Sequence, residues 1–92
     1  MNNRRLFDAI IERKGKEYQF RKLQEELNEL GAAVNHYLTN RNNGVEHLHE
    51  EFADVEIMIE QLKPLLNQKK LMKYRTFKLT RLKNKLKKLG CL

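Results

Sequence analysis

Two groups of acidic side chains stand at helical spacing in this 92-residue chain. The first group holds Glu25, Glu26 and Glu29, and the second holds Glu51 and Asp54. Each group contains an i, i+3 pair of carboxylates, which share one side of a helix. Carboxylates that converge repel one another unless a cation lies between them, and oxygen-only ligands suit Mg²⁺ or Mn²⁺. The spacing therefore indicates a candidate metal site of the kind that phosphoryl chemistry uses.

Helical geometry predicts which of these carboxylates point inward. Glu26 lies roughly 60° and Glu51 roughly 70° from the centre of the apolar stripe of its own helix. Glu29 and Asp54 lie roughly 120° and 130° from those centres. We therefore expect Glu26 and Glu51 to lean toward the core. We also expect no Lys or Arg to be interleaved with the four acids. Acid pairs at this spacing are also typical of an ordinary solvated helix face, and that interpretation stays open.

The apolar pattern predicts four helices that would position these groups. The expected segments are a short helix ending at Gly15, helices over about 17–37, 45–64 and 67–89, and a polar loop at 39–44. Asn67 is expected to cap the last helix, and Gly90 to follow its end. The fold class expected is all-α, an antiparallel bundle of about four helices per chain that assembles as a homo-oligomer, with residues 1–92 forming a single domain.

Composition excludes several other classes of protein. Four Gly and one Pro are too few turn residues for an all-β fold. The longest apolar run is far shorter than the roughly 20 residues of a membrane-spanning helix, so we expect no membrane partner and a cytoplasmic protein. Cys91 is the single cysteine, which excludes an internal disulfide. His47 and His49 lack partners at metal-ligand spacing and are expected on the surface.

The net charge of +7 is unevenly distributed along the chain. Residues 1–62 carry 8 Lys/Arg and 12 Asp/Glu, whereas residues 63–92 carry 11 Lys/Arg and no acid. Lys78 and Arg81 share one side of the last helix, close to its apolar stripe, from which they could contact triphosphate oxygens. Alternatively, their stems lie along the core and their charged ends stay in water. Nucleic-acid binding by the basic helix is a third interpretation, although no RNA-binding signature accompanies it.

The acidic motif resembles the signature of the MazG-like, all-α nucleoside triphosphate pyrophosphohydrolases. The matching order is Glu25-Glu26-x-x-Glu29, then 21 residues, then Glu51-x-x-Asp54. The segment Phe77-Lys78-Leu79-x-Arg81-Leu82 is similar to one found in short bacterial and phage members. One departure is Ala53, which stands where many relatives have Gly.

This resemblance implies Mg²⁺-dependent hydrolysis of a nucleoside or deoxynucleoside triphosphate to the monophosphate and pyrophosphate, in a homodimer or homotetramer. It also implies that Glu26, Glu29, Glu51 and Asp54 hold the metal, and that Glu25 is an outer-shell or second-metal candidate. Lys78 and Arg81 would bind the substrate phosphates. The competing function class is a non-enzymatic helical adaptor whose basic C-terminal helix, at about 67–89, binds nucleic acid or a protein partner.

Overall fold

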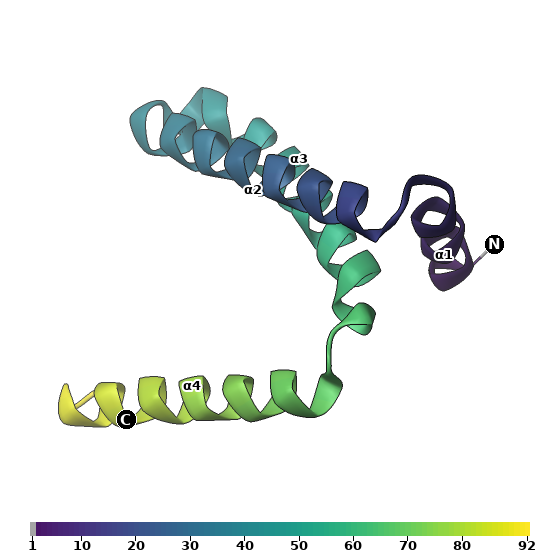
Figure 1. The fold of residues 1–92 in the computed structure, drawn as a ribbon. Helices are drawn as coiled ribbons and strands as arrows, with labels where there is room; N and C mark the ends of the chain where they lie inside the picture. Colours follow the sequence, from purple (N-terminus) through teal and green to yellow (C-terminus); the bar gives the residue numbers. More distant parts are fainter. Residues whose placement is uncertain (1) are drawn as a thin grey trace.

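The computed structural model describes residues 2–92, apart from the side chain of residue 41, and within them it contains helices and no strands (Figure 1). The elements in order are α1 (Asn3–Lys14), α2 (Lys16–Thr39), α3 (Arg41–Leu62), the 3₁₀ turn η1 (Lys63–Leu65) and α4 (Gln68–Lys88). The all-α prediction is therefore confirmed for the described residues. None of these helices is both long enough and apolar enough to span a bilayer.

The predicted helix ends are confirmed at three positions. Gly15 adopts a φ of 93° between α1 and α2, a backbone conformation that residues other than glycine rarely adopt. Asn67 caps α4, because its side-chain oxygen accepts a hydrogen bond from the backbone N–H of Lys70 at 3.0 Å. Gly90, with a φ of 76°, follows the end of α4.

The turn between α2 and α3 differs from the prediction. A single residue, Asn40, separates the two helices, so the polar loop expected at 39–44 is wrong. Gly44 explains how α3 begins so early. A Cβ added to Gly44 would lie 2.8 Å from the Cα of Tyr37, so the absence of a side chain lets the two helix backbones touch there. Polar residues that look like a loop in the sequence thus form the first turn of α3.

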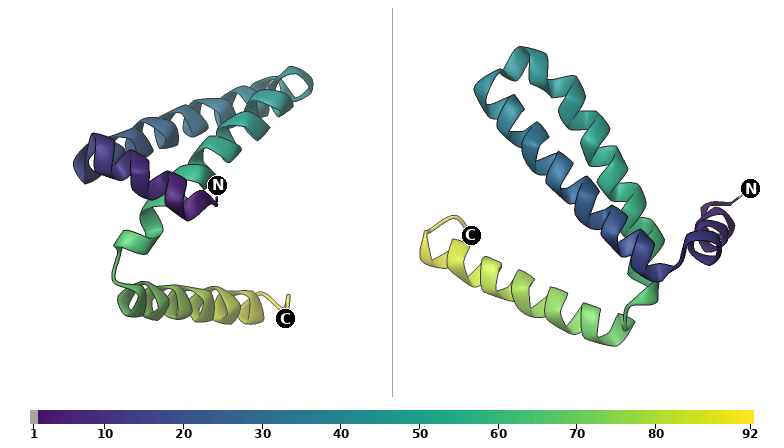
Figure 2. Two further views of the ribbon diagram at one scale, coloured as in Figure 1. Left: turned by 90° about the vertical axis from the view of Figure 1, so that its right-hand side faces the viewer. Right: turned by 45° about the horizontal axis from the view of Figure 1, so that its top comes forward.

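Helices α2 and α3 pack side by side as an antiparallel hairpin (Figures 1 and 2). Their contact, called the seam below, buries a row of side chains on each helix. The row on α2 is Gln19, Glu26 and Ala33, and the row on α3 includes Val55, Met58 and Leu62. Helix α1 packs across the open end of the hairpin, where Phe7 is buried and Arg4 Nη2 donates to the carbonyl of Gln61 at 3.2 Å.

Within the part of the chain that the structure describes, helix α4 makes no extended contact with the other three helices (Figure 2). The chain therefore does not close an antiparallel four-helix bundle by itself, and α2 and α3 are its only antiparallel pair in extended contact within residues 2–92. Its Cα radius of gyration is 17.0 Å. A compact chain of this length has a radius of gyration of about 12 Å. The single chain is thus open, and much of its apolar surface lies outside any intramolecular core.

Candidate metal centre

Three carboxylates from facing helices converge midway along the seam. Glu26 comes from α2, and Glu51 and Asp54 come from α3. One carboxylate oxygen of each lies within 4.8 Å of the other two. Glu26 is buried and Glu51 is partly buried, as their helical angles predicted, whereas Asp54 is exposed. The cluster therefore has a buried floor and an exposed rim.

Each of the two inner carboxylates buries one oxygen that has no hydrogen-bond partner among the described residues. These oxygens are Glu26 Oε2 and Glu51 Oε2. Removing an ionised oxygen from water without supplying a partner is costly, and two such oxygens of like charge also repel each other. A divalent cation bound by both carboxylates would offset both penalties. The donor set consists of hard carboxylate oxygens, so these residues fit Mg²⁺ or Mn²⁺ better than a softer metal.

The remaining oxygen of each inner carboxylate contacts a basic side chain one helical turn earlier. Lys22 Nζ lies 3.3 Å from Glu26 Oε1 and 3.5 Å from a Glu25 oxygen. The hydrogen bond to Glu26, followed by the charge of Glu25, raises the pKa of Lys22 above its ordinary value. His47 Nε2 lies 3.5 Å from Glu51 Oε1. Lys22 and His47 thus contact one oxygen of each inner carboxylate, and the second oxygen of each has no hydrogen-bond partner among the described residues.

Sequence reasoning missed both of these contacts. The expectation that no Lys is interleaved with the acids is wrong because of Lys22. His47 is exposed, as predicted, but its ring nevertheless reaches Glu51 and lies 5.8 Å from the ring of His36, centroid to centroid. The signal that could have revealed both contacts is the i, i+4 spacing of each base from its carboxylate.

Glu29 and Glu25 lie at the rim and are not members of the close trio. The pKa of Glu29 is raised above its ordinary value, first by the negative charge of Glu26 and then by partial desolvation and the charges of Glu51 and Glu25. Glu29 therefore interacts electrostatically with the cluster although its side chain is exposed. Glu25 is exposed and is linked to the cluster through Lys22. The structure thus brings together three of the four predicted metal ligands.

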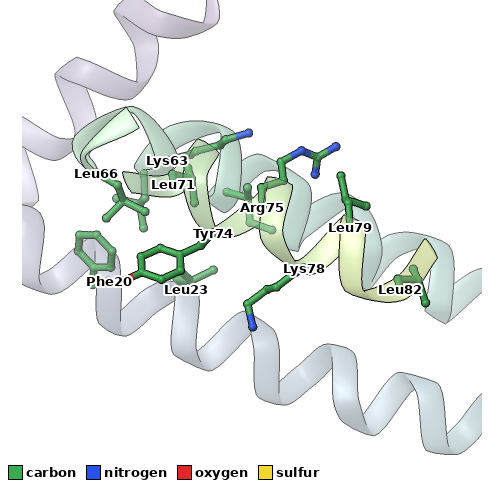
Figure 3. Close-up of a pocket in the computed structure, with 12 residues that line it drawn as sticks. Phe20, Leu23, Lys63, Leu66, Leu71, Tyr74, Arg75, Lys78, Leu79 and Leu82 are labelled. Atoms are coloured by element: carbon green, nitrogen blue, oxygen red, sulfur yellow. The ribbon is translucent and has the colours of Figure 1, made fainter. Parts of the chain in front are cut away.

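Lys78 and Arg81 do not reach the acidic cluster of their own chain. Lys78 lines an apolar groove of about 620 Å³ between α4 and the hairpin, together with Phe20 and Leu23 (Figure 3). Arg81 is exposed, and neither base forms an ion pair within the described part of the chain.

Helical phase explains this separation. On α2, Phe20 follows the seam position at 19 by one residue and is turned by about +100° from it, whereas Glu29 follows Glu26 by three residues and is turned by about −60°. The groove and the acidic rim therefore open on opposite sides of the hairpin.

No family model, curated protein sequence or solved structure matches this chain. The interpretation of the site therefore depends on its own donor atoms and their surroundings. The site has three carboxylates, of which Glu26 and Glu51 each bury one oxygen that has no hydrogen-bond partner among the described residues, and one lysine and one histidine lie beside them. These carboxylates are of the donor type that a divalent cation takes in proteins.

Proposed function

We propose that the protein hydrolyses nucleoside or deoxynucleoside triphosphates to the monophosphate and pyrophosphate with Mg²⁺ bound, and that Mn²⁺ can replace Mg²⁺. The observation that carries this proposal is that Glu26 and Glu51, whose carboxylates lie together with that of Asp54, each bury one oxygen that has no hydrogen-bond partner among the described residues. The resemblance of the acidic motif to MazG-like pyrophosphohydrolases supports this reaction over other uses of a divalent cation.

In this proposal Glu26, Glu51 and Asp54 hold the ion from the seam, and Glu29 adds a carboxylate from the rim. A divalent ion held by these residues would supply positive charge against the triphosphate and would make a bound water a better nucleophile. Water adds to the α-phosphorus, the bond from that phosphorus to the bridging oxygen breaks, and pyrophosphate leaves. The proton released by the water passes to a base at the rim, for which the exposed carboxylates of Glu25 and Asp54 are the candidates.

The basic residues of α4 complete the site by binding phosphate oxygens. Arg81 offers a planar fork that can bind two oxygens, and Lys78 offers a point charge. Because both lie on the far side of their own hairpin, a second copy of the chain must supply them. This requirement agrees with the homodimer or homotetramer that the resemblance implies.

The experiment that tests the proposal measures pyrophosphate release from a panel of nucleotides with and without Mg²⁺. Glu26→Gln and Glu51→Gln should each lower turnover by about 100-fold or more, because each removes charge that holds the ion. Glu50→Gln is the matched control, since it removes the same charge from an exposed neighbour outside the close trio. Circular dichroism should show equal helix content in all three. Full turnover in Glu26→Gln and Glu51→Gln would exclude the site.

A second candidate function is the helical adaptor, and the isolation of α4 favours it. The helix carries ten Lys/Arg and no acid, and it makes no extended contact with another helix of the described residues. Such a helix binds phosphate backbones in a salt-dependent way. A gel shift with mixed nucleic acid that weakens steeply with salt, in a chain that releases no pyrophosphate from any nucleotide, would support the adaptor instead.

A further inference from the structure

One side of the α2–α3 hairpin is apolar and uncovered. This surface, called the hairpin face below, consists of side chains that are 37–51% exposed: Phe20, Leu27, Val34, Phe52 and Ile59. Each residue of the hairpin face comes one position after a seam position, at 19, 26 and 33 on α2 and at 51 and 58 on α3. In antiparallel helices a rotation of about +100° from the contact turns both rows to the same side. The five side chains therefore form a single apolar surface, of the kind that binds a partner.

The amount of exposed surface matches what an obligate dimer buries. The chain has an accessible surface of 7839 Å². A compact monomer of 11.1 kDa is expected to expose about 5,700 Å². The excess of about 2,100 Å² falls within the roughly 1,000–2,500 Å² that each copy buries in an obligate homodimer.

Hydrogen bonds stabilise the corner between α3 and α4. The Gln68 side chain donates to the carbonyls of Lys63 at 2.9 Å and Leu66 at 2.7 Å, next to the Asn67 cap of α4. The groove of about 620 Å³ lies between α4 and one end of the hairpin face (Figure 3). Folding α4 back onto its own hairpin would disturb these bonds, so another chain is the better occupant of the space.

Charge identifies that chain as a second copy. Residues 1–62 have a net charge of −4 and residues 63–92 have a net charge of +11, so the protein carries its own electrostatic complement. The acidic rim lies on the side of the hairpin opposite the hairpin face. Consequently, when two hairpin faces meet, the α4 of each copy projects past the other hairpin and onto its acidic side.

We infer that the hairpin face is covered by the hairpin face of a second copy, which enters the space between the hairpin and α4 so that each basic α4 lies along the acidic side of the other hairpin. The contact is isologous, as expected of a closed two-fold dimer. This assembly does not depend on nucleotide chemistry. One consequence rests on the proposed function: Lys78 and Arg81 then act on the substrate of the partner's acidic cluster.

Light scattering on the purified chain tests this arrangement without measuring any activity. The unmodified chain should have a mass of twice 11.1 kDa, or a higher even multiple. The double variant Leu27→Gln/Ile59→Gln should raise the dissociation constant by about 100-fold, because each residue is expected to contribute more than about 1 kcal/mol at a buried contact. Leu6→Gln is the control, since Leu6 on α1 is exposed to a similar extent but lies outside the hairpin face.

Three outcomes would overturn the inference. The first is an unmodified chain that stays at 11.1 kDa up to high concentration with its full helix content. The second is dissociation by Leu6→Gln with no effect of the double variant. If the double variant does not fold, the unfolding temperature of the unmodified chain decides, because it must rise with protein concentration for an obligate dimer. An unfolding temperature independent of concentration is the third.

Discussion

The seam between α2 and α3 buries Glu26 and the polar pair Gln19 and Gln61, whereas the hairpin face, about 100° around the same helices, leaves Phe20 and Leu27 exposed. The glutamine pair is satisfied, because Gln19 Nε2 donates to Gln61 Oε1 at 2.6 Å. Glu26 keeps one oxygen without a partner. The seam therefore positions polar groups at some cost to stability, and assembly through the hairpin face would offset that cost. In our proposals the site and the assembly surface lie on opposite sides of one hairpin.

The largest expected effect distinguishes a site completed by a second copy from one completed within a single chain. A chain with Lys78→Ala/Arg81→Ala keeps its acidic cluster, and a chain with Glu26→Gln/Glu51→Gln keeps its basic helix. Each should be nearly inactive alone in pyrophosphate release. Co-refolded in equal amounts, they should recover about a quarter of the wild-type activity, because half of randomly assembled dimers are mixed and each mixed dimer contains one complete site.

The control for this mixing experiment is a pair of chains that both carry Glu26→Gln, with and without the Lys78→Ala/Arg81→Ala changes. No mixed dimer of that pair has an intact acidic cluster, so no activity should return. An inactive mixture in the main experiment, from chains that demonstrably form mixed dimers, would mean that the basic residues do not act between copies.

A second prediction compares two glycines of the hairpin. Ala is intrinsically better than Gly in a helix by up to about 1 kcal/mol. At Gly31 an added Cβ meets nothing within 4 Å, so Gly31→Ala should raise the free energy of unfolding by about 0.5–1 kcal/mol. At Gly44 the Cβ would lie 2.8 Å from a backbone atom of Tyr37, so Gly44→Ala should force the helices apart and cost about 1–3 kcal/mol.

Denaturant unfolding followed by circular dichroism measures both glycine variants. Because the chemical change is identical, opposite signs would establish that the close approach of α2 and α3 at Gly44 is required for the hairpin. Equal stabilisation by both substitutions would show that the helices do not touch there, and the early start of α3 would lose its explanation.

The sequence predicts the elements of this fold well but not which faces pack together. The apolar stripe of α2 suggests that Leu27 and Val34 pack inside the chain, yet the structure buries Glu26 and Ala33 against α3 and leaves the two apolar residues exposed. Hydrophobic periodicity identifies the apolar face of a helix, but it does not show whether that face packs against the same chain or against another one. For the same reason the position of α4 could not be predicted from its stripe, since the corner formed by η1 and the bonds of Gln68 lies outside that stripe.

The candidate site was predictable where it depends on helical angle alone. Glu26 and Glu51 each lie within about 70° of the apolar stripe of their own helix, so an inward position could be predicted for both, although the buried seam runs through Glu26 itself and not along that stripe. Asp54 joins them because it follows Glu51 by three residues. The contact of Lys22 with Glu26 is not predicted by the apolar pattern. Predicting it requires asking which basic side chain one helical turn away can reach the buried carboxylate. Acidic spacing therefore locates the cluster, and its electrostatics require the basic neighbours as well.

The smallest expected effect concerns the pKa of Glu29. This pKa reports the electrostatic interaction of Glu29, at the exposed rim, with the buried carboxylate of Glu26. The charge of Glu26 is the main cause of the raised pKa of Glu29, and Glu25 contributes less. In metal-free solution, carboxyl carbon NMR should therefore show a lower Glu29 pKa in Glu26→Gln, with a smaller decrease in Glu25→Gln. A Glu29 pKa unchanged by Glu26→Gln would place the two carboxylates in separate environments and remove Glu29 from the ligand set.

The same shift predicts the direction of a pH dependence. Native Glu29 binds a proton more tightly than unfolded Glu29, so its contribution to stability is present in acid and is lost as the pH rises through its native pKa. The unfolding temperature of Glu29→Gln minus that of the unmodified chain should therefore increase from acidic to neutral pH in the presence of a chelator. Mg²⁺ should reverse this trend, because only the unmodified chain gains the full set of ligands and metal binding displaces the proton. A difference independent of both pH and Mg²⁺ would separate Glu29 from the acidic cluster.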